Sequence, residues 1–312
     1  MRLQDLKNEK YRPCFSGHET FPLRYGWLQK AYHAVSNASS PKEAVHVFRD
    51  PESIALFGVG RNMIAAIRYW AIGTGILDET KEGIETTWLG DMLFSEDGID
   101  LYLEEDASLW LLHWHLAARP RLTSAYWLFN EYRGGGFVRQ DIVTSLLSLS
   151  QECAWSRVAA TTVDRDLQCL LRTYIGGRGS SEARDSILAE LGLIRPIDKH
   201  RAHLSRGRKL SLPDAVFLYC LIEFWENFAS EQNTMSFENT AYAPGSPGRV
   251  FLLDEEDIVG RLERLEDVSK GALVWSETAG LRQIIRSNRR SIQLERNALY
   301  DELVNTCIQV AT

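Results

Sequence analysis

The stretch Arg61-Asn-Met-Ile-Ala-Ala-Ile-Arg-Tyr-Trp-Ala-Ile72, preceded by Gly58-Val59-Gly60, decides how the first part of this chain folds. Its apolar residues recur at steps of three and four, the period of an amphipathic α-helix. One face carries Met63, Ile64, Ile67, Trp70 and Ala71, and the other carries Arg61, Asn62, Ala65 and Arg68. The glycines permit a tight turn before the helix, with Val59 filling the gap. We therefore expect a helix with a buried apolar face and an outward polar face.

The flanking sequence predicts the rest of a winged helix-turn-helix. Residues 23–36 have helical apolar spacing, and a second short helix is expected within 43–57, with Asp50-Pro51 at its start. Residues 75–88 predict two short strands around a turn at 81–83. Arg61, Asn62 and Arg68 on the outer face of the third helix suit base edges and phosphates in a major groove. A three-helix core with solvated arginines and no DNA has the same pattern.

A similar order of elements recurs twice further along the chain. Helices are expected at 139–149 and 162–174, followed by a basic segment from 199 to 209. The last part predicts a helix at 213–228, a turn and strand at 245–253, a helix at 255–265, and a strand plus helix at 273–285. We expect a mainly α fold with small β-hairpins (α+β), built from tandem winged helix-turn-helix-like modules over residues 1–90, 91–212 and 213–312.

Composition limits the function classes. With 45% hydrophobic and 25% charged residues, the 312-residue chain is of the globular type. Its net charge of −7 argues against indiscriminate nucleic-acid binding, although residues 1–80 and 117–214 are basic on balance. No apolar run approaches a membrane span and no signal-peptide pattern is visible, so we expect a cytoplasmic protein with no membrane partner. The five scattered cysteines predict reduced thiols rather than disulfides or structural zinc.

The segment Cys14-Phe-Ser-Gly-His-Glu-Thr-Phe-Pro22 is the first candidate for chemistry. Adjacent His18 and Glu19 could ligate a divalent ion or relay a proton to water. The alternative is that both residues cap the following helix through backbone hydrogen bonds.

A second candidate is the acidic stretch 96–106, which precedes a helix over 108–116 that is apolar nearly all round. Asp100 and Glu104, next to a buried His113, could hold Mg²⁺ or Mn²⁺ for phosphodiester cleavage. These acids could equally complement the helix dipole, and His113 could be a hydrogen-bonded core histidine.

The basic segment 199–209 could be a second wing on DNA phosphates or an exposed loop. Its candidate DNA contacts are Arg201, Arg206, Arg208 and Lys209. No phosphate-binding glycine loop followed by Lys-Ser/Thr is present, so we expect no nucleotide or organic cofactor and no ATPase activity.

Four separated blocks resemble the SspB family of bacterial DNA phosphorothioation clusters. They are Phe15-Ser-Gly-His-Glu-Thr-Phe-Pro-Leu-Arg-Tyr-Gly-Trp27, Gly58-Val-Gly-Arg-Asn-Met-Ile64 with Ile67-Arg-Tyr-Trp70, Trp110-Leu-Leu-His113, and Ser246-Pro-Gly-Arg-Val-Phe251. The resemblance implies an anti-phage system in which sulfur replaces a non-bridging phosphate oxygen, with SspB as the DNA-nicking endonuclease. It also implies three partner proteins: a cysteine desulfurase, an ATPase and an ATP-pyrophosphatase-type sulfur transferase.

Two hypotheses follow. In the first, the chain is a DNA-nicking endonuclease that uses His18, Glu19, Asp100, Glu104 or His113, with Mg²⁺ or Mn²⁺. In the second, it is a non-catalytic subunit that binds double-stranded DNA and brings the sulfur-transfer enzymes to their site. The residue patterns favour DNA binding over DNA cleavage. Cleavage is implied by the family resemblance.

Overall fold

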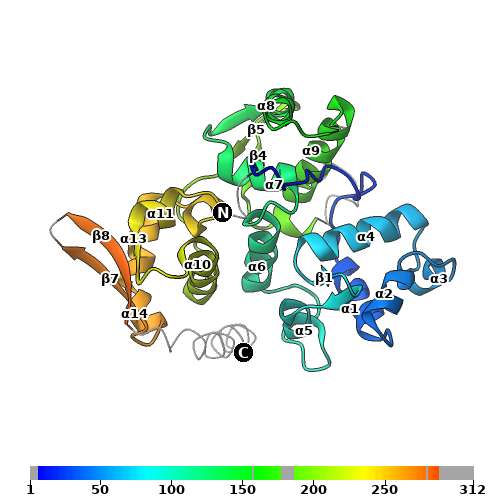
Figure 1. The fold of residues 1–312 in the computed structure, drawn as a ribbon, viewed down its shortest axis with the longest axis horizontal. Coiled ribbons are helices and arrows are strands. Elements are labelled where there is room, and N and C mark those ends of the chain that lie inside the picture. Colours follow the sequence, from blue (N-terminus) through cyan, green and yellow to red (C-terminus); the bar gives the residue numbers. More distant parts are fainter. Residues whose placement is uncertain (1–5, 157, 177–185, 279, 288–312) are drawn as a thin grey trace.

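The structure, a computed structural model, describes residues 6–156, 158–176, 186–278 and 280–287. Figure 1 shows helix α6 (Asp106–Ala117) near the centre, with α1 to α5 on one side, α10 to α14 on the other, and α8 and α9 at the top of the view. Three small antiparallel sheets complete the fold. The expected class, helical with small antiparallel β-elements, is confirmed. No helix in the described part is both long and apolar enough to cross a membrane.

The first group of elements packs around α4, which follows the predicted period closely. Gly58 ends α3 with a left-handed backbone (φ 66°), as expected for the turn before α4. The helix predicted from residue 23 begins only at Trp27, because Gly26 is also left-handed (φ 74°). The single helix expected within 43–57 is two short helices, and Glu52, not Asp50, precedes the second. The elements are α1 (Trp27–Ser36), α2 (Pro41–Val47), α3 (Ser53–Phe57), α4 (Arg61–Gly73), β1 (Leu77–Glu79), β2 (Ile84–Thr86) and α5 (Trp88–Phe94).

The second group follows α6 and contains a three-stranded antiparallel sheet. The sheet has the order β3-β5-β4, so the hairpin β4–β5 pairs with the earlier strand through β5. Helices α8 and α9 match the two predicted helices. The elements are α7 (Thr123–Tyr126), the π-helical turn η1 (Trp127–Glu131), β3 (Gly136–Val138), α8 (Arg139–Glu152), α9 (Ala160–Ile175), the short 3-10 turn η3 (Ile187–Ala189), β4 (Ile194–Pro196) and β5 (Arg201–Leu204).

The third group corrects two predictions. The strand expected within 245–253 is a helical turn, because Pro247 follows a Ser246 hydroxyl that caps it. The helix expected after the strand at 273–285 is instead β8, which turns back at Gly280 and buries Ile284. The elements are α10 (Asp214–Ala229), β6 (Thr234–Ser236), α11 (Phe237–Tyr242), α12 (Pro247–Val250), α13 (Glu255–Glu263), α14 (Leu265–Val268), β7 (Leu273–Thr278) and β8 (Leu281–Arg286).

The second and third groups share one order of elements. Each has a short strand, then helices, then a hairpin whose second strand pairs with the first strand, giving β3-β5-β4 and β6-β8-β7. The first group has helices and a hairpin without the leading strand. The predicted boundary after residue 90 falls inside α5, so a division there would cut a helix, whereas the boundary after 212 falls in the loop before α10. Residues 288–312 of the predicted third module lie outside the described residues.

Trp70 is a fully buried side chain in the core of the first group of elements. Its indole is 1% exposed and donates a hydrogen bond from Nε1 to the carbonyl of Phe21 at 2.9 Å. That bond ties α4 to the loop that carries the first candidate for chemistry. The indole belongs to an apolar core that runs through all three groups.

We predict that Trp70→Ala lowers the free energy of unfolding by about 3–5 kcal/mol, the usual cost of truncating a buried aromatic side chain. Chemical denaturation followed by circular dichroism measures this change. The control is Trp88→Ala, since Trp88 is 40% exposed and should cost clearly less. Equal losses in the two variants would contradict the role assigned to Trp70.

Candidate nucleic-acid interface and the polar clusters around it

The outward face of α4 begins with two exposed polar residues. Arg61 and Asn62 are exposed in its first turn, while Ile64, Ile67 and Trp70 are buried on the opposite face. Arg68 lies further along and is half-buried, in an ion pair with Glu79 of β1. The structure therefore separates the two faces of this helix as predicted, but it gives Arg68 an intramolecular carboxylate partner.

A pocket of about 630 Å³ opens beside this face of α4. It lies between the loop at 14–19, α4 and β1, and Glu19 is on its wall. Arg121 forms an ion pair across to Asp78 at 2.9 Å. The pocket carries cationic and anionic groups together, lined by Arg49, Arg68 and Arg121 and by Glu19, Asp78 and Glu79.

His18 does not face this pocket. Its side chain is 4% exposed, and Nδ1 accepts a hydrogen bond from the backbone N–H of Thr20 at 2.9 Å. The ring proton is therefore on Nε2, which lies 3.2 Å from Oδ1 of the buried Asp166, at ion-pair distance but outside hydrogen-bond geometry. The ring of Tyr69 packs edge-on against His18, and burial raises the pKa of that phenol well above its usual value. His18 is thus held by the protein's own groups.

Glu19 points away from His18 because the loop reverses between them. Glu19 and Thr20 have left-handed backbones, with φ of 48° and 67°, an arrangement that costs about 1–2 kcal/mol per non-glycine residue. Gly17 is required for two reasons: its φ of 122° strains any L side chain, and a Cβ there would lie 2.7 Å from the Tyr69 ring. The loop buries His18 and exposes Glu19, so the two residues do not form the joint site considered from the sequence.

Asp100 has a structural role in the acidic stretch. It is 6% exposed, and its carboxylate accepts hydrogen bonds from the backbone N–H groups of Glu104 and Glu105 at 2.9 and 3.1 Å. Glu104 is exposed. No group of three or more His, Cys, Asp or Glu side chains in the described residues is placed to hold a metal ion. The described chain therefore does not fit a metal site with three or more protein ligands.

His113 is a core histidine with both ring nitrogens paired. It is fully buried in α6, and Nε2 donates to the carbonyl of Val250 at 2.8 Å. Nδ1 consequently accepts from the hydroxyl of Tyr174 at 2.6 Å. Burial lowers the pKa of His113 to about 4. The ring is neutral near pH 7 and has no free nitrogen, so the structure gives it no path to DNA.

The basic segment 199–209 divides into exposed and buried parts. Arg206 and Arg208 are exposed, and Arg201 pairs with Asp198 at 2.6 Å. Lys209 is 9% exposed, and its ammonium donates to the carbonyls of Ser205 and Gly207 at 2.7 and 2.9 Å. Burial lowers the pKa of Lys209 to about 8. Lys209 therefore holds this loop in place, and we leave it out of the proposed DNA contacts.

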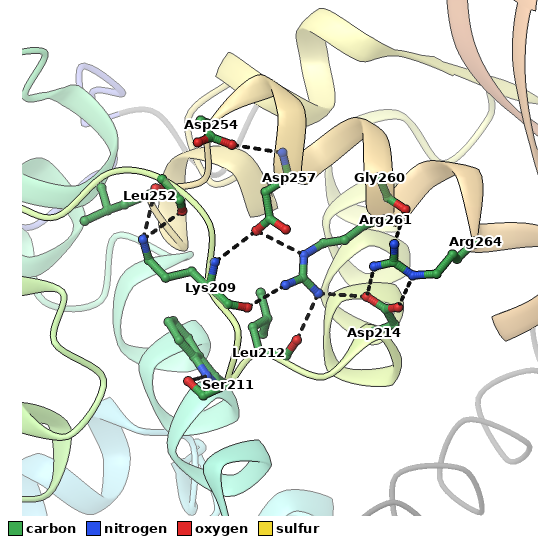
Figure 2. A network of polar contacts seen from close by, with 12 residues as sticks. Lys209, Ser211, Leu212, Asp214, Leu252, Asp254, Asp257, Gly260, Arg261 and Arg264 are labelled. Carbon is green, nitrogen blue, oxygen red and sulfur yellow. Dashed lines mark hydrogen bonds and ion pairs between the residues drawn. The ribbon is translucent and has the colours of Figure 1, made fainter.

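A polar network ties that loop to α13, as Figure 2 shows. Asp257 accepts a hydrogen bond from the backbone N–H of Lys209 at 3.2 Å, and Arg261 donates to the Lys209 carbonyl at 2.8 Å. Arg261 also pairs with Asp214 at 2.8 Å, as does Arg264 at 2.6 Å. Each buried cation here has acceptors, as burial of charge requires.

The sequence did not reveal which side chains lie next to the predicted site residues. Asp166 lies in α9 among apolar residues, and nothing in its local pattern connects it with His18. Arg49 and Arg121 reach the pocket from segments that carry no motif. Only the tertiary contacts bring these groups together.

We predict that His113 makes stability fall as the pH drops. Its folded pKa of about 4 lies below the ordinary 6.5, so between these values the unfolded state binds the extra proton. His113→Phe should reduce the slope of unfolding free energy against pH in this window by up to about 1.4 kcal/mol per pH unit. Denaturant titrations across pH measure the slope, with His46→Phe, an exposed histidine, as the control. An unchanged slope in His113→Phe would contradict the assignment.

Comparisons with known proteins agree with this architecture. The chain matches the family described as "Protein of unknown function (DUF4007)" over residues 15–301. It is similar to a magnesium ion-bound SspB crystal structure, with 25% identity and a TM-score of 0.79, covering 92% of this chain and 88% of that one. A second SspB crystal structure matches with 26% identity, a TM-score of 0.77 and the same coverage. No curated protein matches the chain. The chain therefore belongs to the DUF4007 family and is an SspB-like protein.

Proposed function

We propose that this chain is the DNA-binding component of an Ssp-type DNA phosphorothioation system. The observation that carries the proposal is the outward face of α4, where Arg61 and Asn62 stand exposed beside a pocket with further arginines, in a chain similar to SspB over 92% of its length. The expected partners are duplex DNA, a cysteine desulfurase, an ATPase and an ATP-pyrophosphatase-type sulfur transferase.

The arrangement of elements supports a winged helix-turn-helix interpretation. Helix α3, the turn at Gly58 and helix α4 are followed directly by the antiparallel hairpin β1–β2. In such modules the second helix enters the major groove and its N-terminal residues contact base edges. Arg61 and Asn62 occupy the first turn of α4, the position from which a base edge is reached. The repeated order in the other two groups supports the same interpretation for them.

The charge distribution requires that DNA binding be local. The chain has a net charge of −7, so an evenly spread surface would repel phosphate. Ion pairing also removes charge from some candidates, since Arg68 faces Glu79 and Arg201 faces Asp198. Arg61 is the strongest candidate on α4 because it is exposed and makes no ion pair with a described residue.

We predict that Arg61→Ala/Arg68→Ala weakens duplex binding and lowers its salt dependence by one to two phosphate contacts, a change of about 0.9 to 1.8 in the logarithmic slope, because Arg68 contacts a phosphate only when it leaves Glu79. Fluorescence anisotropy with labelled duplex across salt concentrations measures both quantities. Arg264→Ala, which removes a cation paired with Asp214, is the control for lost charge. If affinity and slope remain at the wild-type values, α4 is not the DNA-facing helix.

A second candidate function is strand nicking, and the position of Glu19 favours it. Its exposed carboxylate lies on the wall of the pocket that also carries Arg49 and Arg121. A carboxylate can take a proton from an attacking water, while guanidinium groups stabilise charge on the phosphate. One of the two similar SspB structures is described as magnesium ion-bound. Since the described residues form no group of three metal ligands, we assign no step to a metal.

We predict that, if the chain nicks DNA, Glu19→Gln reduces nicking by at least about a hundredfold while folding and DNA affinity are kept. Conversion of supercoiled to relaxed plasmid measures nicking, with magnesium, manganese and chelator compared. Glu96→Gln, another exposed glutamate, is the matched control. DNA binding by the wild type without nicking under any of these conditions would favour the non-catalytic subunit, and normal nicking by Glu19→Gln would exclude Glu19 as the base.

A further inference from the structure

Three arginines meet at one backbone turn that the proposed α4 interface does not include. Arg249 of α12 donates to the carbonyl of Asn130 from Nε at 2.9 Å and to the carbonyl of Tyr132 from Nη2 at 3.1 Å. Arg206, in the loop after β5, donates to the same Tyr132 carbonyl at 3.5 Å. Arg133 follows Tyr132 directly in the chain. We call Arg133, Arg206 and Arg249 the arginine cluster.

Among the residues that the structure describes, no carboxylate forms an ion pair with a member of the cluster. Arg261 and Arg264, which also come together, do so around the carboxylate of Asp214. Within the described part of the chain, by contrast, none of the three cluster arginines makes an ion pair. Burial and the charge of Arg133 lower the pKa of Arg206, and the same two causes lower that of Arg249 to about 10. Glu131 raises the pKa of Arg249, but the two side chains do not form an ion pair. The cluster is therefore a concentration of positive charge without an ion-paired acid in the described part of the chain.

The cluster combines one fixed cation with two accessible ones. Arg249 is 4% exposed and is held by the Asn130 and Tyr132 carbonyls, which leaves Nη1 without a hydrogen bond to a described residue. Arg133 and Arg206 are exposed. A planar guanidinium with a fixed orientation and two exposed neighbours suits the tetrahedral oxygens of a phosphate.

The chain next to the cluster gives a phosphate backbone room to approach. Arg133 is followed by three glycines, and a Cβ at Gly135 would meet no atom within 4 Å. Gly135 is exposed, so open space lies beside the cationic turn. Arg195 and Lys209 add positive charge close by, since the charges of Arg195 and Arg206 both act on Lys209. Asp254 and Asp257 also lie near Lys209 and offset part of its charge, while their carboxylates accept hydrogen bonds from backbone N–H groups of α13 and of Lys209.

We propose that the arginine cluster binds phosphate groups of the DNA backbone, as a second contact surface separate from α4. This inference rests on the proposed function, because it assumes that the chain binds duplex DNA. The proposal also gives a role to the sequence block Ser246-Pro-Gly-Arg249. The Ser246-capped turn of α12 places Arg249 within hydrogen-bond distance of the Tyr132 carbonyl. Contacts to phosphate carry no sequence information, so the cluster adds affinity and register while the α4 face reads bases.

The test is the salt dependence of duplex binding by Arg133→Ala/Arg206→Ala. Both side chains are exposed, so the double variant should fold with the wild-type melting temperature. We expect the dissociation constant to rise on the order of tenfold at low salt, and the logarithmic salt slope to fall by about 1.8, two phosphate contacts. The matched control, Arg139→Ala/Arg264→Ala, removes two arginines that pair with Asp164 and Asp214 and should change the slope much less.

The outcomes separate the inference from the proposed function. If Arg61→Ala/Arg68→Ala weakens binding but Arg133→Ala/Arg206→Ala does not, the cluster is not a DNA contact and the α4 interface stands. If wild-type protein does not bind duplex at all, the proposed function fails together with the inference. A calorimetric titration with inorganic phosphate is the third arm. Phosphate binding that the cluster variant abolishes, with its DNA binding unchanged, would show a small-anion site and overturn the inference.

Discussion

Helix α6 is buried on nearly every side, and its polar side chains determine where its neighbours lie. His113 joins it to the Tyr174 hydroxyl of α9 and to the Val250 carbonyl at the end of α12. Trp114 donates to Glu223 of α10 at 2.9 Å. An unpaired polar group in this interior would cost about 1–3 kcal/mol, so these bonds permit few other arrangements. The buried imidazole of His113 thereby relates the second group of elements to the third, and Figure 1 shows α6 near the centre of the molecule.

This constraint explains why the two cationic surfaces belong to different groups of elements. The face of α4 depends on Trp70 and the loop at 14–22, whereas the arginine cluster depends on α12, which His113 fixes against α6. A chain of net charge −7 binds DNA only where cations remain without acidic partners. Ion pairs neutralise part of the arginine content, and Arg61 and the cluster are among the arginines that make no such pair with described residues. In the proposed function, base reading by α4 and phosphate contact by the arginine cluster would together give affinity with register.

The features that the sequence predicted are those that depend on contiguous spacing. The faces of α4, the hairpin β1–β2 and the buried α6 all follow from apolar periodicity within one segment. The sequence left open whether His18 and Glu19 act together or bond to the backbone, and the left-handed backbones of Glu19 and Thr20 bury His18 while they expose Glu19. No spacing rule shows which non-glycine residue will adopt that backbone. Lys209 looked like part of a basic wing, but its carbonyl partners include Leu252, far away in the chain. For the same reason, the sequence revealed neither the contact between His18 and Asp166 nor the arginine cluster.

If the first turn of α4 lies against DNA, a photoreactive group placed in that turn will crosslink to the duplex. A photoreactive phenylalanine in place of the exposed Asn62 should crosslink to duplex on irradiation, in a reaction that unlabelled duplex suppresses. The same group in place of Tyr102, which is 69% exposed in the acidic stretch, should give little or no crosslink. Crosslinking from position 102 but not from position 62, with both variants folded and binding duplex, would contradict the account.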